Sequence, residues 1–170
     1  SKARINFIKR NGGVNMATSK QVIFKVGTEE YGSDIQLVSA IESYGGVVPV
    51  PNAPSYILGI LNLRGEVIPV FSLRKKFGLP ESEVDDKTLL LITKYQNMKI
   101  GFKVDSVSEI EEVDEEELHK MPVIVCTEAT NYAKCVVNKK GRMIILINHE
   151  GILSSEEAKA LNTVLKKQKE

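Results

Sequence analysis

Two stretches of the chain repeat each other, and this internal repeat limits what the chain can fold into more than any other feature. Residues 21–41 align without a gap on residues 90–110, at an offset of 69 positions. The identical pairs are Ile23/Ile92, Lys25/Lys94, Gly32/Gly101, Val38/Val107, Ser39/Ser108 and Ile41/Ile110. A match of this length predicts that the chain contains the same structural plan twice.

A second pair of segments repeats further along the chain. The segment around residues 61–71 aligns on residues 136–147 at an offset of 76, with Asn62/Asn138, Gly65/Gly141 and Ile68/Ile144 identical. Each half is about 65 residues long, which is marginal for an independently stable domain. No Gly/Ser-rich linker divides the halves, so we expect two lobes that share a core or interlock. The acidic segment 111–117 accounts for the larger offset in the second block, as an insertion.

The repeated segments are typical of strand hairpins. Each combines β-branched or aromatic residues with a turn that contains Gly, Asn or Gln. The predicted hairpins are Val22–Val26 with Glu30–Ile35, Thr88–Lys94 with Met98–Val104, the two arms of 61–71 around Arg64-Gly65, and those of 136–147 around Lys140-Gly141. The fold class predicted is mainly β, a barrel or a sandwich.

Helical signals are confined to short segments. Residues 72–77 predict one or two turns, closed by Gly78 and Pro80. A longer helix is predicted over residues 154–168, with Ser154 at its start and lysines at its end. We expect one folded domain over 16–170, with a second lobe at roughly 85–150. Residues 1–15 are predicted to be a flexible or vector-derived arm, since Met16 resembles a natural start.

Composition excludes several classes of protein. The 170 residues include 23 Lys+Arg and 22 Asp+Glu, a net charge of +1, and 42% are hydrophobic. A disordered chain would be more charged and less apolar. No apolar run reaches the roughly 18 residues that span a bilayer. Two cysteines do not make a disulfide scaffold, which favours a reducing, cytoplasmic setting.

The search for catalytic or cofactor chemistry is mostly negative. The histidines are His119 and His149, the cysteines Cys126 and Cys135, and none has the close spacing of a zinc site. Glycine-rich phosphate motifs are missing, so we expect no cofactor and no metal. A Cys–His nucleophile stays open, although neither cysteine lies in a basic setting. The acidic run 109–117 is predicted to be a solvated surface segment.

A nucleic-acid-binding β-barrel is the alternative function. It is suggested by the basic residues of the arm, by Arg64 and by Arg74-Lys75-Lys76. Such proteins also stack bases on exposed aromatic side chains. Aromatic residues make up only 6% of this chain, and without the arm the net charge is −3, because 19 basic residues then stand against 22 acidic ones.

Several motifs in order resemble the CheW family of bacterial chemotaxis adaptors, over roughly residues 20–165. The main one is Gly59 to Phe77 (GILNLRGEVIPVFSLRKKF), and segments 29–35, 50–54 and 101–110 fit as well. The resemblance implies two interlocked five-stranded, SH3-like barrels without enzymatic activity. It implies a coupler between chemoreceptor cytoplasmic tips and the regulatory domain of the histidine kinase CheA, in arrays at the inner membrane surface. Similar lobes also occur in CheA itself and in the adaptor CheV.

The resemblance also suggests the partner-binding residues. Arg64, within Asn62-Leu63-Arg64-Gly65, matches the family arginine linked to receptor and kinase coupling. Val38, Val107 and Ile110 match positions near an inter-lobe groove that receives the helical hairpin of the receptor. A plain core position is the competing interpretation for these three residues, and an ordinary solvated arginine is the competing one for Arg64.

The chain departs from the family pattern at two places. Ala40 stands where the family often has an acid, and Glu42 is the residue that could replace it. Ser72 stands where an acid usually precedes the short helix. The basic residues Arg64 and 74–76 belong to the first lobe and the acidic run to the second, so the near-zero net charge conceals two differently charged lobes.

Overall fold

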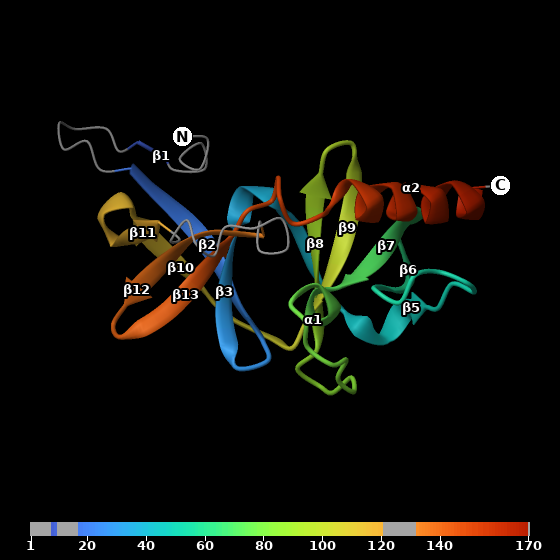
Figure 1. Cartoon of the computed structure of the whole chain (residues 1–170), viewed down its shortest axis with the longest axis horizontal. Helices are drawn as coiled ribbons and strands as arrows, with labels where there is room; N and C mark the ends of the chain where they lie inside the picture. The colour runs from blue at the N-terminus through green and yellow to red at the C-terminus, as the bar shows by residue number, and fades with distance from the viewer. Residues whose placement is uncertain (1–7, 10–16, 121–131, 170) are drawn as a thin grey trace. The chain divides into compact units, whose positions relative to one another are not determined.

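The chain contains two β-sheet units, each built from segments that lie far apart in the sequence (Figure 1). The computed structural model describes residues 8–9, 17–120 and 132–169. The first unit comprises Ser1–Leu37 and Val107–Ile152, and the second comprises Val38–Ser106 and Leu153–Glu170.

The first unit is a seven-stranded sheet. Its strands are β1 (Ile8–Lys9), β2 (Ala17–Val26), β3 (Glu29–Asp34), β10 (Ser106–Asp114), β11 (Leu118–Lys120), β12 (Ala133–Lys139) and β13 (Arg142–Ile147). The order is β1-β2-β3-β13-β12-β11, with β10 also paired to β2. The contact between β3 and β13 is parallel and pairs Gly32 with Leu146. A short 3₁₀ turn, η4 (Glu115–Glu117), joins β10 to β11, while η2 (Ile35–Leu37) follows β3.

The second unit is a six-stranded sheet with the same plan. Its strands are β4 (Val38–Ser43), β5 (Val47–Val48), β6 (Ile57–Leu63), β7 (Glu66–Ser72), β8 (Leu89–Tyr95) and β9 (Met98–Val104). Their order is β4-β8-β9-β7-β6-β5. The parallel contact between β7 and β9 pairs Val70 with Gly101. At offsets of 69 and 76 this pair corresponds to Gly32 and Leu146 of the first unit, so the repeat holds at the level of register.

Each unit combines strands from both halves of the chain. The β2–β3 hairpin of the first half pairs with β10 and β13 of the second half, and the β8–β9 hairpin of the second half pairs with β4 and β7 of the first. This exchange confirms a mainly β fold of two interlocked lobes with a C-terminal helix. It also moves the boundary expected near residue 85 to residue 106, because β8 and β9 stay with the strands that they pair with.

The acidic run is not the insertion that the sequence suggested. Its first part extends β10, and Glu115–Glu117 forms η4, the counterpart of η3 (Tyr44–Gly46) in the second unit. Arg142 pairs with Glu109 at 3.2 Å and with Glu111 at 3.7 Å. The run therefore belongs to the sheet, and its acids neutralise basic residues of neighbouring strands.

Both predicted helices are present and begin at serine caps. In α1 (Leu73–Lys76) the Lys75 amide donates to Ser72 Oγ at 3.1 Å, so Ser72 caps the turn without an acid. Before α2 (Ser155–Lys169), the Glu157 amide donates to Ser154 Oγ and Glu157 accepts from the Ser154 amide, which is a capping box.

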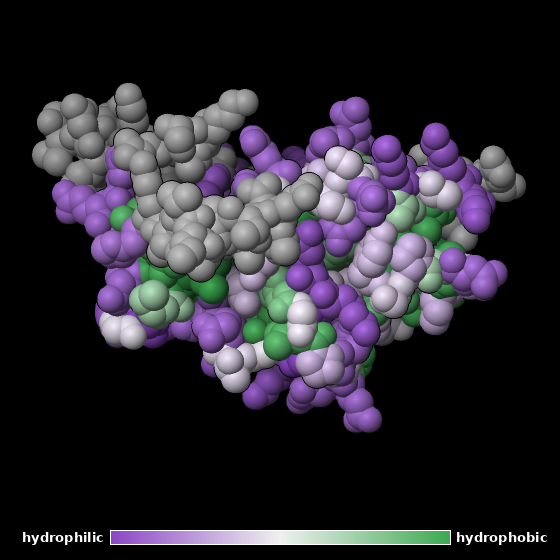
Figure 2. Space-filling model, in the orientation of Figure 1, coloured by the Kyte–Doolittle hydropathy of each residue, from purple (hydrophilic) through white to green (hydrophobic). Residues whose placement is uncertain are grey.

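Helix α2 is amphipathic and packs against β7 (Figure 1). Its residues Leu161 and Val164 are buried. Figure 2 shows mainly hydrophilic atoms on its outer side. Of the arm predicted over residues 1–15, only Ile8 and Lys9 are described, and they pair with β2. The remaining residues of that prediction lie outside the described ranges.

Each unit has its own apolar core. In the first unit Ile23, Val113, Val137 and Ile144 are fully buried together. In the second unit Ile68, Val70, Leu90 and Ile92 form the corresponding cluster. The repeat thus places corresponding strands around two equivalent cores.

Candidate partner-binding site

The strongest candidate from the sequence, Arg64, lies at the apex of the β6–β7 hairpin in the second unit. Arg64 has φ 53° and Gly65 has φ 85°, two successive left-handed residues between the paired residues Leu63 and Glu66. This is the geometry of a type I′ hairpin turn, whose twist matches that of the strands. Gly65 adopts its φ at little cost because it lacks a Cβ.

Two neighbours hold this turn in place. The Gly65 amide donates to Asn62 Oδ1 at 3.1 Å. Leu63 packs against the core of the second unit. The guanidinium of Arg64 is exposed, and within the described part of the chain it forms no hydrogen bond or ion pair. The turn thus presents an exposed cation with five directed donors, which suits recognition of a carboxylate or a carbonyl on another protein.

The three apolar candidates lie on equivalent strands of the two units. Val38 is half-buried on β4, Val107 is half-buried at the start of β10, and Ile110 is 56% exposed in the middle of β10. Ile41, the repeat counterpart of Ile110, is 42% exposed on β4. The interpretation of Ile110 as a core residue is therefore wrong, while Val38 and Val107 are partly accessible.

The departure at Ala40 has a structural explanation. Ala40 is half-buried and packs against the core of the second unit. Glu42 lies two residues further along the same strand, so its side chain projects from the same face. The structure brings Asn62, Leu63, Arg64 and Gly65 together on one turn, and it places Val38 on a different strand of that unit.

A surface hollow of about 470 Å³ adjoins the Arg64 turn within the second unit. It is lined by the β6–β7 turn, the β8–β9 turn and the last part of α2. The residues are Arg64, Gly65, Glu66, Val67, Asn97, Met98, Lys99 and Leu165. Two of these side chains form an ion pair, with Lys99 Nζ 3.1 Å from Glu66 Oε1.

Sequence reasoning missed the hollow. Met98 and Lys99 belong to the hairpin of the other half of the chain, and Leu165 belongs to the C-terminal helix. None of them forms a local motif with Arg64. The internal repeat is the sequence signal that could have drawn attention to Lys99. Lys99 lies within residues 90–110, the block that aligns on the first half, directly before Ile100 and Gly101.

The described residues do not carry the catalytic alternatives. Burial raises the pKa of Cys135 to about 11, which keeps its thiol protonated and unreactive. Burial lowers the pKa of His149 to about 4, with a further contribution from Lys134, and its ring pairs with Ser33 Oγ at 2.9 Å. No cluster of three metal-ligating side chains occurs in the described ranges. Cys126 lies outside them.

Comparison with known proteins decides the family. The model described as "CheW-like domain" matches residues 20–157. The chain belongs to the CheW family. The chemotaxis protein CheW of Klebsiella aerogenes is 35% identical over 145 residues, which cover 85% of this chain and 87% of that protein. CheW of Bacillus subtilis is 31% identical over 141 residues, covering 83% and 90% of the two chains.

A solved CheW structure supports the same conclusion. The scaffolding protein TtCheW from Thermoanaerobacter tengcongensis is similar to this chain with a TM-score of 0.74 and 29% sequence identity. The match covers 82% of this chain and 96% of TtCheW. This CheW-family chain is thus a non-catalytic chemotaxis scaffold that couples receptors to CheA, as the motifs implied, and the nucleic-acid-binding alternative is set aside. Among the described residues, none of the helices combines the length and the apolar character of a membrane-spanning segment.

Proposed function

We propose that this CheW-family chain binds the cytoplasmic tip of a chemoreceptor and the regulatory domain of CheA, in arrays at the inner face of the membrane. The observation that carries the proposal is the exposed Arg64 on a rigid I′ turn, which lies within the family motif Asn62-Leu63-Arg64-Gly65. The turn is held by Asn62 and by the packing of Leu63, so partner binding can use Arg64 without first ordering a loop.

Replacement of Arg64 by glutamate should weaken binding to the receptor tip or to the kinase domain by about tenfold or more, because a charged contact becomes repulsive. Isothermal titration against each purified partner measures the effect. The matched control is Lys140→Glu: Lys140 and Gly141 form the equivalent turn in the first unit, with φ 53° and 80°. Binding by Arg64→Glu equal to that of Lys140→Glu would show that Arg64 has no role.

The apolar part of the proposal concerns Val38, Val107 and Ile110, which we expect to contact the receptor's helical hairpin. Exposed Ile110 offers the clearest test. Changing it to aspartate should reduce receptor-tip binding by about tenfold, because a helix docks by burying apolar side chains. Met143→Asp is the control, since Met143 is also 56% exposed and lies on β13 of the same unit. An equal loss for both variants, or none for Ile110→Asp, contradicts the assignment.

A further inference from the structure

The hollow beside the Arg64 turn has a mixed apolar and basic lining. Val67, Met98 and Leu165 supply its apolar parts, and all three are partly accessible to solvent. They come from β7, β9 and α2, three elements of the second unit (Figure 1). An accessible apolar recess with polar edges is the kind of surface that accepts an anchor side chain from another protein.

The basic residues that line the hollow are Arg64 and Lys99, and Lys99 has a second lysine opposite it in the β8–β9 hairpin. Lys94 and Lys99 are direct cross-strand partners in the β8–β9 hairpin, so both side chains project from one face. Like charges at this position destabilise a hairpin. Glu66 offsets Lys99, whereas Lys94 is exposed and pairs with no acid among the described residues.

The first unit resolves the equivalent position differently. There Lys25 faces Glu30, an opposite-charge pair. Glu30 accepts two hydrogen bonds from Arg142, at 2.8 and 3.0 Å, and Glu109 accepts a third at 3.2 Å. The counterparts of Glu30 and Glu109 in the second unit are Lys99 and Ala40.

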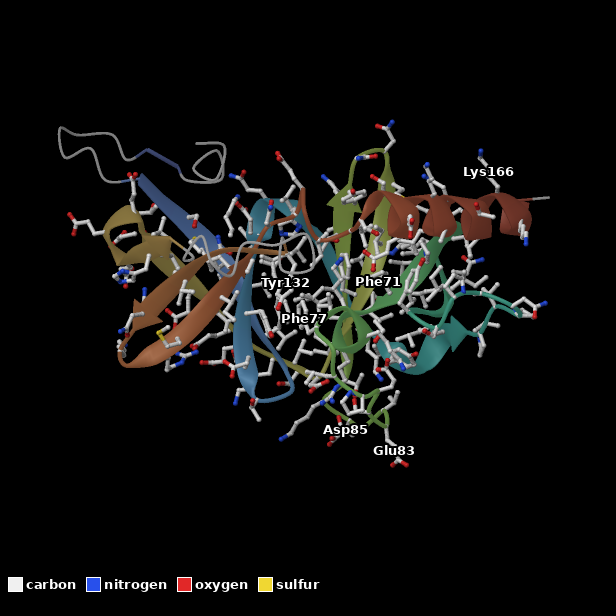
Figure 3. The ribbon with its side chains drawn as sticks, viewed as in Figure 1. Phe71, Phe77, Glu83, Asp85, Tyr132 and Lys166 are labelled. Atoms are coloured by element: carbon white, nitrogen blue, oxygen red, sulfur yellow. The ribbon has the colours of Figure 1, made fainter. Side chains whose placement is uncertain are left out.

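The two units therefore carry the same hairpin with different charge balance. Lys25 and Arg142 meet Glu30 and Glu109 in the first unit, so the charges there cancel within the unit. Lys94 and Lys99 meet only Glu66 in the second. An excess of positive charge is left at the hollow, and Arg64 adds to it. Lys166, next to Leu165, points outward from α2 (Figure 3).

We propose that this hollow is the docking site of an acidic protein segment that inserts one apolar side chain against Val67, Met98 and Leu165. Its acidic residues neutralise the excess positive charge of Lys94 and Lys99, which Glu66 offsets only in part. The inference deepens the proposed function, because it gives the chemistry of the segment that one signalling partner places beside Arg64. The partner surface then extends from the β6–β7 turn to the β8–β9 turn and the end of α2.

Changing Lys94 to glutamate separates binding from folding. The variant converts the Lys94–Lys99 pair into an opposite-charge pair, with the signs exchanged relative to Lys25 and Glu30 of the first unit, so its melting temperature should rise slightly. The affinity of the full chain for either the receptor tip or the kinase domain should nevertheless fall by about tenfold. The remaining affinity should depend less on salt concentration than that of the wild type. The control is Lys87→Glu, the same change of charge at an exposed loop position outside the hollow.

A model peptide tests binding at the hollow without the receptor tip or the kinase domain. The probe is a short peptide of glutamates around one leucine, and the readout is amide chemical shifts of the labelled full-length chain. We expect shifts at Gly65, Asn97 and Lys99, which disappear in Lys94→Glu and with a lysine-containing version of the peptide. Leu165→Gln should lose the response to the central leucine while Lys87→Glu keeps it.

The outcomes distinguish this inference from the proposed function. Wild-type protein that binds neither the receptor tip nor the kinase domain contradicts the proposed function, whatever the peptide shows. Wild-type binding that Lys94→Glu and Leu165→Gln leave unchanged, with no peptide shifts at the hollow, overturns the docking site and leaves the proposed function standing. Equal binding losses in Lys94→Glu and Lys87→Glu overturn it as well, since the effect is then one of net charge.

Discussion

Replacement of Gly59 by alanine is expected to lower the free energy of unfolding by about 4 kcal/mol, enough to unfold the second unit of a marginally stable protein. A Cβ at this position would lie 2.3 Å from the Val48 carbonyl oxygen and 2.8 Å from its carbon. Both are backbone atoms of β5, so the clash is not relieved by a side-chain rotation. Gly59 also has φ 155°, which residues with a side chain rarely adopt.

The consequence should be local to the β5–β6 contact. Val48 pairs with Ile60 and Val47 with Leu61, and both pairs must separate to admit the new methyl group. Chemical denaturation measures the loss, and hydrogen exchange should report it at β5 and β6 first. Gly45→Ala is the control, because a Cβ there meets nothing within 4 Å. Similar stabilities for the two variants would contradict the close approach of β5 to Gly59.

Loss of the Glu81 carboxylate should cost about 3 kcal/mol, since it leaves a buried lysine without its counter-ion. The side chain of Lys103 is 4% exposed, and its Nζ donates to Glu81 Oε1 at 3.0 Å and to the Ser82 carbonyl oxygen at 2.9 Å. The ammonium also lies 5.3 Å from the centre of the Tyr44 ring. Glu81→Ala removes the only one of these partners that carries a negative charge.

Two companion measurements test this explanation. Glu83→Ala, in the exposed loop nearby (Figure 3), should be neutral. The double variant Glu81→Ala/Lys103→Met should recover most of the stability, because an apolar side chain then occupies the buried site. A double variant as unstable as Glu81→Ala alone would show that packing of the loop, and not the charge of Lys103, is responsible.

The same pair predicts a dependence on pH. Burial would raise the pKa of Glu81, but hydrogen bonds from Ser72 and Lys103 outweigh it and hold the pKa below its ordinary value. The carboxylate therefore contributes its full stabilisation above the unfolded-state pKa, and this contribution is lost as the pH falls through the lower pKa of the folded protein. The difference in stability between wild type and Glu81→Ala should shrink accordingly in acid.

Local patterns predicted the strands well. The hairpins at Gly27-Thr28, Arg64-Gly65, Gln96-Asn97 and Lys140-Gly141 were expected from turn residues between apolar segments, and all four form. The internal repeat predicted two interlocked lobes. The sequence did not predict which hairpin joins which lobe. Equivalent strands of the two halves have similar apolar patterns, so a hairpin could pair equally well with strands of its own half or of the other half.

The family motif identified Arg64 from neighbouring residues alone, because a type I′ turn depends only on the few residues that form it. The surroundings of Arg64 depend on the pairing of distant segments. Lys99 reaches Glu66 through the exchanged β8–β9 hairpin, and Leu165 reaches the hollow because α2 packs against β7. Neither contact leaves a periodic or spaced signal in the chain.

By itself, the amino-acid sequence determined the strands, their turns, the twofold plan and the family, because each depends on local composition or on a repeated motif. The tertiary structure alone decided which charges meet. At one repeat position Lys25 faces Glu30 and Arg142 binds that glutamate, whereas at the other Lys94 faces Lys99. Gly59 and Cys135 likewise occupy equivalent positions of the repeat. Only Gly59 has to be a glycine, because the backbone of β5 approaches it closely. Such demands arise from contacts between distant residues, whose energies no local pattern records.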